Sequence, residues 1–210
     1  MTRPMPMVFV IDDDASVRKA LARFLKAAGF RSQLFASAEE FLEQPAPDSP
    51  ACALLDVSMP GLSGLDLQHA LAERDVRLPV IFITGHGDIP MSVHAMKAGA
   101  ADFLTKPFSA PDLLAAVHQA MARHAEALQA RAAETAVQQR AETLSQRERE
   151  VMELVVRGLL NKQSGYKLGV SEKTIKAHRA QVMRKMQANS LPELVRMAEK
   201  IGIKAGAPGY

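Results

Sequence analysis

The first 120 residues alternate between short apolar runs and longer segments in which apolar and polar residues recur with helical spacing. The runs fall at residues 7–11, 51–55, 79–83 and 102–104, with a weaker one at 31–35. Short buried strands that alternate with amphipathic helices are typical of a parallel sheet covered on both faces. The pattern therefore predicts an α/β domain of five βα units, with functional residues at the carboxyl ends of the strands.

A long polar helix is expected after this domain. Residues 122–143 are rich in Ala, Glu, Gln and Arg and contain no Gly or Pro, which is the composition of strong helix formers. An apolar stripe with helical spacing fades after Leu128. We predict a helical linker that continues the preceding helix, with a coiled-coil dimer as the alternative.

The rest of the chain shows only helical patterns. Ser145 followed by Glu148 is a capping-box signature, Ser171 is a good N-cap, and Pro192 falls in a first turn. Gly169 is expected to end the helix that precedes it. Four short helices are predicted to form an all-α domain. The predicted organisation is an α/β domain at 1–121, a helical linker at 122–142, a four-helix domain at 143–204 and a flexible tail at 205–210.

Charge divides the chain in two. The 210 residues carry a formal net charge of +3. Residues 1–125 hold 11 Lys and Arg against 14 Asp and Glu, a net of −3, whereas residues 145–210 hold 13 against 6, a net of +7. The basic second domain favours a polyanionic partner, with an ordinary solvated surface as the alternative.

Two further features bear on the class of protein. A single cysteine, Cys52, excludes an internal disulfide framework and a Cys-rich zinc site. The sequence has no apolar run long enough to cross a membrane and no signal-peptide pattern at its start. We therefore expect a cytoplasmic protein without a membrane partner.

Polar residues gather where the predicted strands end. Residues 12–14, all aspartate, follow the first strand, Asp56 ends the third, Thr84 ends the fourth and Lys106 follows the fifth. Carboxylates brought this close repel one another unless a cation joins them. Mg²⁺ prefers oxygen ligands from carboxylates, water and phosphate. The group therefore predicts a Mg²⁺ site at which Thr84 and Lys106 hold a phosphoryl group as it transfers to a carboxylate.

Residues 7 to about 120 resemble the receiver domain of response regulators in two-component signalling, which has a flavodoxin-like (βα)5 fold. The likeness rests on "VIDDD", "LLDVSMPGLSGLDL" and "PVIFITGHGDIPMSVHAMKAGAADFLTKPF", and the last stretch is especially similar to the FixJ branch. The resemblance implies that Asp56 is the phosphoacceptor and receives its phosphoryl group from a sensor histidine kinase. It implies that Mg²⁺ is ligated directly by Asp13 and Asp56, through water by Asp12, and by the backbone carbonyl of Ser58.

The same resemblance implies a conformational switch. Thr84 and Lys106 would contact the aspartyl phosphate, and the Lys106–Pro107 peptide would be cis. Phe103 would turn inward as Thr84 moves towards the phosphate, changing the face of the fourth helix and fifth strand. Two receivers would pair through the fourth helix, the fifth strand and the fifth helix, and we predict Val93, Met96 and Lys97 on that face. His86 and Ser58 are expected to influence the lifetime of the phosphate.

A phosphatase of the haloacid-dehalogenase type is the alternative from another class, because Asp12-x-Asp14 matches the start of that family's motif. This interpretation leaves Asp56 and its "MPGLSG" loop without a role, and no acidic residue beyond Asp112 is placed to complete the motif. Steady release of phosphate from small phosphomonoesters would favour the phosphatase, whereas a receiver domain would acquire one phosphate and hydrolyse it slowly. We expect instead that the protein is not an enzyme, and that its receiver domain has only Mg²⁺-dependent phosphotransfer and self-dephosphorylation activity.

The second domain contains a helix-turn-helix pattern. "NKQSGYKL" is followed by the basic helix "SEKTIKAHRAQVMRKMQ", in which Ile175, Val182 and Met186 occupy a separate apolar face. Residues 143–202 resemble the C-terminal domain of LuxR/NarL/FixJ regulators through "LSQREREVMELVVRGLLNKQ" and "LGVSEKTIKAHRAQVMRKM". The resemblance implies that Lys176, Ala177, Arg179 and Ala180 face the major groove. It implies phosphate contacts from Ser171, Lys173, Thr174, Arg184, Lys185, Asn161 and Lys162.

One departure from that family lies in the first helix of the motif, where Ser164-Gly165 stands in place of the usual Ile-Ala. Losing the Ile side chain costs about 2–4 kcal/mol, and a glycine inside a helix costs about 1 kcal/mol more. We expect a looser helix, with Gly165 the more benign change and Tyr166 available to repack. The alternative function is a second domain with weakened DNA binding that acts mainly in dimerisation or protein interaction.

These features together predict a transcriptional regulator controlled by phosphorylation. The expected partners are the cognate kinase, promoter DNA and RNA polymerase, and phosphorylation is expected to produce a homodimer on a two-fold site. A linker helix that keeps the protein dimeric or inhibited regardless of phosphate is a further alternative.

Overall fold

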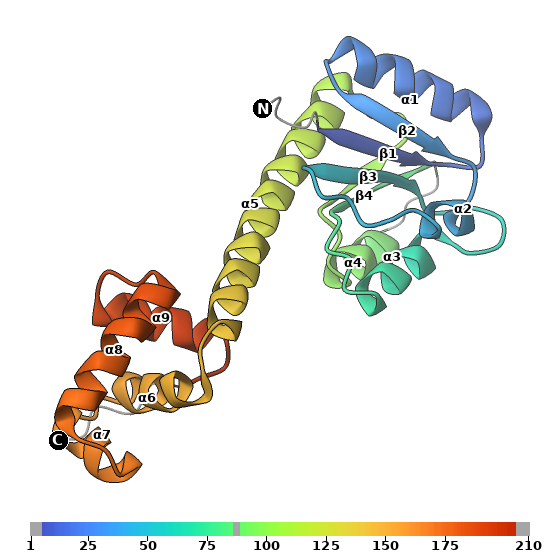
Figure 1. Ribbon diagram of the computed structural model, residues 1–210. Helices are drawn as coiled ribbons and strands as arrows, with labels where there is room; N and C mark the ends of the chain where they lie inside the picture. Colours follow the sequence, from blue (N-terminus) through green and yellow to red (C-terminus); the bar gives the residue numbers. More distant parts are fainter. Residues whose placement is uncertain (1–5, 86–88, 205–210) are drawn as a thin grey trace. The chain divides into compact units, whose positions relative to one another are not determined.

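The computed structural model describes residues 6–85 and 89–204, so the predicted tail at 205–210 and the side chain of His86 lie outside the described residues (Figure 1). The chain divides into two compact units, Met1–Gln129 and Ala130–Tyr210. The division falls inside the stretch predicted as a linker. Within the described ranges, no helix is long and apolar enough to cross a membrane.

The first unit is a five-stranded parallel sheet in the order β2-β1-β3-β4-β5. The predicted α/β fold is confirmed, although β4 begins at Val80 rather than at residue 79. The strands are β1 (Met7–Ile11), β2 (Arg31–Phe35), β3 (Ala51–Asp56), β4 (Val80–Thr84) and β5 (Asp102–Thr105). The helices between them are α1 (Ala15–Ala27), α2 (Ala38–Leu42), α3 (Gly64–Glu73) and α4 (Ile89–Lys97), and α5 (Ala110–Glu142) follows β5.

Two hydrophobic cores lie on the two faces of this sheet. Successive residues of a strand point to opposite faces, so Phe9 enters one core and Val10 enters the other. The first core packs beneath α2, α3 and α4, and the second beneath α1 and α5 (Figure 1). The inner strands β1, β3 and β4 are apolar except at their carboxyl ends, whereas the edge strand β2 carries polar residues along its length.

Helix α5 runs without interruption through the predicted linker, which confirms its helical continuation. In the first unit, Val117 is part of the core, and His124 accepts a hydrogen bond from the Ala51 backbone N–H at 2.9 Å. In the second unit, Val137 and Ala141 are part of a separate core. Both ends of the segment are therefore packing elements of their own unit.

The second unit contains four further helices, α6 (Gln146–Val156), α7 (Asn161–Leu168), α8 (Glu172–Met186) and α9 (Leu191–Lys200). The predicted capping box between Ser145 and Glu148 is present at α6, and Ser171 caps α8. Gly169 ends α7 in the left-handed conformation with φ +66°, as its lack of a side chain permits. The buried face of α8 consists, as predicted, of Ile175, Val182 and Met186.

Candidate functional site

The strand ends of the first unit bring two carboxylates onto one lysine. The Lys106 ammonium lies 3.0 Å from Asp56 Oδ1 and 3.1 Å from Asp12 Oδ2. Asp12 follows β1 and Asp56 ends β3, and these strands are neighbours in the sheet. The two aspartates are 3% and 8% exposed. Carboxylates this buried require a compensating cation. Lys106, which follows the edge strand β5, supplies it.

The protonated state of Lys106 follows from these contacts. Burial by itself would lower the pKa of Lys106, but hydrogen bonds to Asp56 and Asp12, together with their negative charges, outweigh burial and raise the pKa. One positive charge therefore faces two negative charges. The site keeps a net negative charge that favours an additional cation.

Backbone amides hold the second oxygen of each carboxylate. The Ser58 N–H donates to Asp56 Oδ2, and the Asp14 N–H donates to Asp12 Oδ1, both at 2.8 Å. Each carboxylate thus has one oxygen on Lys106 and the other on a backbone donor two residues further along the chain. This arrangement fixes the rotation of both carboxyl groups before any ligand arrives.

The three consecutive aspartates have different environments. Asp12 is buried, Asp13 is exposed, and Asp14 caps α1 by accepting the Ser16 N–H at 2.7 Å. That hydrogen bond lowers the pKa of Asp14. Within the described part of the chain, no three acidic, His or Cys side chains are grouped as a ready-made metal site. A cation bound here would therefore take oxygens from backbone, water or phosphate as well.

The loop after Asp56 is held by residues that the sequence did not single out. A Cβ atom at Gly64 would lie 2.3 Å from the Asp56 carbonyl oxygen, so only glycine allows the start of α3 to approach the strand end. Glu39 of α2 accepts the Leu62 N–H at 3.1 Å and ties the loop to the neighbouring helix. The "MPGLSG" pattern signals the glycine. Nothing in the sequence signals the role of Glu39, because its partner Leu62 lies 23 residues further along the chain.

The two predicted switch residues lie in adjacent strands. Thr84 is 1% exposed at the end of β4. Phe103 is half-buried on β5, with its ring centroid 6.3 Å from that of Phe82. It packs on the core cluster that Met91 of α4 also contacts. The Lys106–Pro107 peptide is cis, as the resemblance implied.

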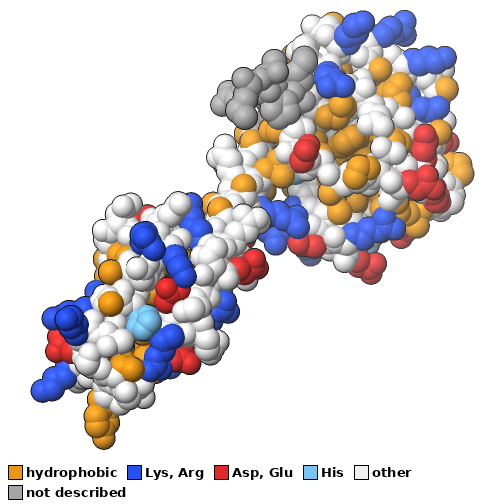
Figure 2. All heavy atoms as spheres, in the orientation of Figure 1, with side chains coloured by type: hydrophobic (Ala, Val, Ile, Leu, Met, Phe, Trp, Pro, Cys, Tyr) orange, Lys and Arg blue, Asp and Glu red, His pale blue; other side chains and the backbone are white. Residues whose placement is uncertain are grey.

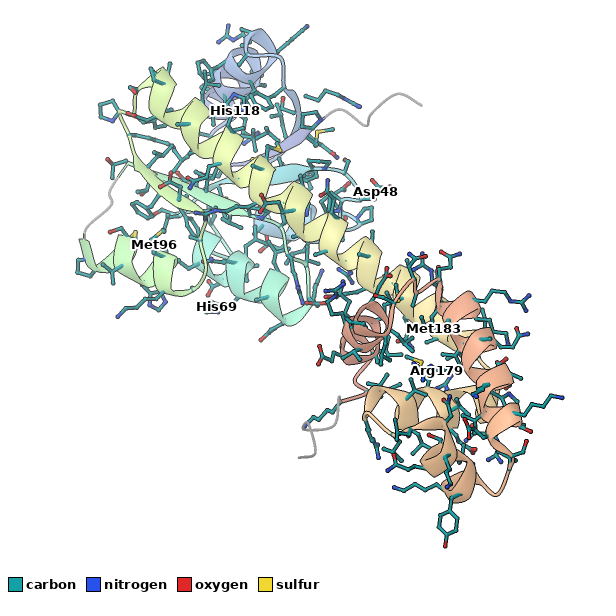
Figure 3. All side chains as sticks on the ribbon, turned by 90° about the vertical axis from the view of Figure 1, so that its left-hand side faces the viewer. Asp48, His69, Met96, His118, Arg179 and Met183 are labelled. Carbon is teal, nitrogen blue, oxygen red and sulfur yellow. The ribbon has the colours of Figure 1, made fainter. Side chains whose placement is uncertain are left out.

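Helix α4 presents apolar side chains to solvent. Val93 and Met96, one turn apart, are 44% and 47% exposed, and Lys97 beside them is also exposed. Figure 3 labels Met96 on this helix. Adjacent exposed apolar residues are a feature of interaction surfaces, which is consistent with the predicted dimer face.

Basic side chains cover much of the visible face of the second unit (Figure 2). Of the residues predicted to contact DNA, seven are exposed: Lys162, Ser171, Lys173, Lys176, Ala177, Ala180 and Arg184. Asn161, Thr174 and Arg179 are half-buried. Arg179, labelled in Figure 3, donates to Asn161 at 3.4 Å across the two helices of the motif. This contact places both residues at the junction of α7 and α8.

Lys185 differs from the other predicted phosphate contacts. Its ammonium lies 2.6 Å from the Glu148 carboxylate and 3.0 Å from the Thr143 carbonyl oxygen. Glu148 is only 6% exposed. The lysine is therefore paired with a carboxylate of its own unit, and its contact with DNA phosphate stays a prediction.

The structure shows the surroundings of Ser164 and Gly165, where the sequence departs from the family pattern. Ser164 is fully buried, and its hydroxyl has no hydrogen-bond partner. A Cβ atom at Gly165 would lie 2.7 Å from the Val170 carbonyl oxygen, which agrees with the expectation that Gly165 is the more benign of the two changes, since this position needs a small residue. Tyr166 is 92% exposed and does not repack into the helix interface. The close approach of α7 to the turn depends on glycine.

Two family models match the chain. Residues 8–118 match the response regulator receiver domain, and residues 142–198 match the bacterial regulatory proteins of the luxR family. The two matches correspond to the two units of the structure.

Curated relatives and solved structures agree with these matches. Nodulation protein W of Bradyrhizobium diazoefficiens is 48% identical over 95% of this chain and 88% of its own length. Transcriptional regulatory protein FixJ of Azorhizobium caulinodans is 48% identical over 93% of both chains. The response regulator StyR superposes with a TM-score of 0.83 at 46% identity, covering 94% of this chain and 100% of StyR. Full-length FixJ from B. japonicum gives a TM-score of 0.56 at 43% identity, covering 96% of this chain and 98% of FixJ.

Proposed function

The chain belongs to the LuxR-type response regulators of two-component systems, and we propose that phosphorylation of Asp56 controls its binding to promoter DNA. The observation that carries this proposal is the Lys106 ammonium held between Asp56 and Asp12. The lysine is placed to neutralise charge on a phosphoryl group attached to Asp56. The buried Thr84 at the end of β4 is the second expected contact.

This geometry supports a phosphoryl transfer to Asp56. A carboxylate oxygen of Asp56 attacks the phosphorus of a kinase phosphohistidine, the new O–P bond forms, and the N–P bond breaks with its electrons returning to the imidazole. Lys106 then exchanges part of its contact with Asp56 for a phosphoryl oxygen. The Ser58 N–H keeps the carboxyl group oriented during attack. Positioning and charge stabilisation account for most catalysis of this class of reaction.

The donor set fits a hard divalent cation. The two buried carboxylates exceed the single charge of Lys106, and Mg²⁺ is commonly bound by one or two carboxylates together with water and phosphate. Asp12, Asp13, Asp56 and the Ser58 carbonyl would hold it. When bound, Mg²⁺ would offset charge on the transferring phosphoryl group.

An apolar depression beside the site suits the kinase. It measures about 440 Å³ and is lined by α1, the start of α5 and the loop between Lys106 and Ala110. Its lining residues are Val17, Ala20, Leu21, Phe24, Lys106, Pro107, Phe108, Ala110 and Leu113. Because Lys106 contacts both Asp56 and this depression, a helix of the kinase docked here would bring its phosphohistidine towards Asp56.

The output is proposed to be a dimer on DNA. Contact between Thr84 and the phosphate would change the packing of Phe103 and bias the α4 face with Val93, Met96 and Lys97 towards pairing. Helix α8 would then enter the major groove of each half-site, with Lys176 and Arg179 reaching the base edges. Promoter-bound dimers would contact RNA polymerase.

Phosphorylation is tested with acetyl phosphate and Mg²⁺, followed by intact-protein mass spectrometry. The wild-type chain should gain a single phosphoryl group, and Asp56→Asn should gain none. Asp13→Asn serves as a comparison, because it should slow labelling without removing the acceptor. Labelling of Asp56→Asn at another residue would overturn the assignment.

DNA binding is tested by fluorescence anisotropy with promoter fragments, before and after phosphorylation. Steep weakening of binding with added salt, with tighter binding of the phosphorylated protein, supports the proposal. Salt-independent or absent binding together with phosphorylation-dependent dimerisation would favour the alternative of a second domain used for protein interaction.

A further inference from the structure

We propose that Arg18 of α1 is a positioning residue for the divalent cation, because it holds the peptide group from which Asp13 projects. This role rests on the proposed function, in which Mg²⁺ binds beside Asp56. The Arg18 guanidinium donates a hydrogen bond to the backbone carbonyl of Asp12, six residues earlier in the chain. Arg18 is half-buried, so a side chain from the start of α1 reaches back to the end of β1.

This hydrogen bond fixes the backbone on the N-terminal side of Asp13. The Asp12 carbonyl and the Asp13 N–H belong to one planar peptide group, so a contact that orients one orients the other. A charged donor makes such a bond roughly twice as strong as one between neutral groups. The orientation of the chain as it enters Asp13 is therefore set by a side chain of the following helix.

The backbone on the C-terminal side of Asp13 is held as well. The Asp14 N–H donates to Asp12 Oδ1 at 2.8 Å, which closes a turn of the kind that Asp side chains form with the backbone two residues on. Asp14 is itself engaged at the start of α1, where its carboxylate accepts the Ser16 N–H at 2.7 Å. Asp13 is thus the central residue of a turn in which both flanking peptide groups are fixed.

The Asp13 carboxylate is the free member of this group. Asp13 is exposed, and within residues 6–85 and 89–204 its carboxylate has no hydrogen bond or ion pair. Asp12, by contrast, is bound by Lys106 and by the Asp14 N–H. A free carboxylate on a fixed backbone is a preorganised ligand, because the turn is ordered on folding and loses less conformational entropy when a cation binds.

The charge of Arg18 acts in the opposite direction. A guanidinium group stays protonated, and a positive charge near a cation site repels the cation. If charge were the main contribution of Arg18, its removal would tighten Mg²⁺ binding. Since Arg18 fixes one of the two peptide groups that flank Asp13, we expect positioning to dominate and its removal to weaken binding. The sign of the change separates the two roles.

Mg²⁺ is titrated into the full-length, unphosphorylated protein while the backbone amides of Asp13 and Asp14 are followed by NMR. Wild type should give saturable shifts. Arg18→Ala should weaken Mg²⁺ affinity about five- to tenfold, the factor expected for loss of one hydrogen bond. Arg18→Lys keeps a charged donor without the planar fork and should recover most of the affinity. The control Lys19→Ala removes an exposed positive charge from the same turn and should not weaken binding.

A double-mutant cycle with Asp13→Ala tests whether Arg18 acts through Asp13. In the Asp13→Ala background, Arg18→Ala should weaken Mg²⁺ binding less than about twofold, because the carboxylate that it positions is gone. A residue with a merely structural role would weaken binding by the same factor in both backgrounds. The amides of β4, remote in sequence from the turn, report whether each variant is folded.

The proposal is overturned if wild type gives no saturable Mg²⁺ shifts, if Arg18→Ala binds Mg²⁺ as tightly as wild type or more tightly, or if the cycle shows no coupling between Arg18 and Asp13. An equal loss of affinity in Lys19→Ala would also overturn it, since the effect would then be one of general charge. These titrations need no phosphoryl donor. Failure of Asp56 to be labelled at saturating Mg²⁺ would therefore reject the proposed function and leave the role of Arg18 standing.

Discussion

The Lys185 ammonium on α8 lies 2.6 Å from the Glu148 carboxylate on α6, and Glu148 also closes the capping box with Ser145. One buried carboxylate therefore joins the start of α6 to the last turn of the proposed recognition helix. The orientation of α8 depends on this ion pair as well as on its apolar face.

This relationship predicts acid sensitivity of the second unit. The hydrogen bond from Lys185, followed by that from the Ser145 N–H, lowers the pKa of Glu148 below its ordinary value of 4.5. A depressed carboxyl pKa stabilises the fold above pH 4.5, and this contribution is lost as the pH falls through the folded-state pKa. The hydrogen-exchange protection factors of α8 amides, which compare each measured rate with the intrinsic rate at the same pH, should therefore fall below pH 4.5 in the full-length chain.

Glu148→Gln provides the comparison. At neutral pH it should destabilise the second unit by roughly 1–3 kcal/mol, the usual worth of a hydrogen bond to a charged group. Once the pH is below the folded-state pKa of Glu148, the α8 exchange of the variant should approach that of wild type at the same pH, since both side chains are then neutral. A difference that stays constant with pH would assign the stabilisation to packing.

Opposite stability changes are predicted at Ser164 and Gly165. Ser164→Ala removes a buried hydroxyl without a partner and should stabilise the second unit by roughly 1 kcal/mol. Gly165→Ala improves helix propensity by about 1 kcal/mol, but its Cβ atom meets the Val170 carbonyl oxygen, and overpacking costs about 1–3 kcal/mol. We expect a net loss of roughly 1 kcal/mol.

Thermal unfolding of the full-length chain measures both changes, with hydrogen exchange assigning each effect to α7 and α8. Stabilisation by Gly165→Ala would show that the turn at Val170 moves readily to admit a methyl group.

Two positions on α8 should differ in what they contribute to DNA binding. Lys173→Ala should weaken binding to all sequences alike and reduce the slope of log affinity against log salt by about 1. Arg179→Ala should cost about 1–3 kcal/mol on the preferred site and relax discrimination there. Anisotropy titrations at several salt concentrations, with Arg196→Ala on α9 as the control for charge, distinguish these effects. Equal losses on matched and mismatched DNA would exclude Arg179 from base recognition.

A substitution in the apolar depression beside Asp56 should affect phosphorylation by the kinase but not phosphorylation by acetyl phosphate. Ala20 is exposed and lines the depression, so Ala20→Glu should leave the fold intact while placing a charge against the docked kinase. Transfer from the phosphorylated kinase should slow by at least tenfold, the effect of about 1.4 kcal/mol of lost docking energy. Labelling by acetyl phosphate should be unchanged. If Ala20→Glu slowed both transfer from the kinase and labelling by acetyl phosphate, the substitution would be acting on Asp56 itself and not on kinase docking.

The order of apolar and polar residues was enough to predict the five βα units, the helical continuation of α5, the caps of α6 and α8, and the meeting of Asp12, Asp56 and Lys106. These features were predictable because hydrophobic periodicity identifies which face of an element is buried, and parallel strands deliver their ends to one edge. The Lys106 contacts follow directly from that topology.

Which long side chains meet across elements became clear only from the packing of those elements. Lys185 lies on the same helix as the exposed Lys173 and Lys176, yet it pairs with a glutamate 37 residues away. The close contact at Gly165 and the exposure of Tyr166 likewise depend on how closely neighbouring segments approach. Periodicity carries no information on those distances, because it describes one element at a time.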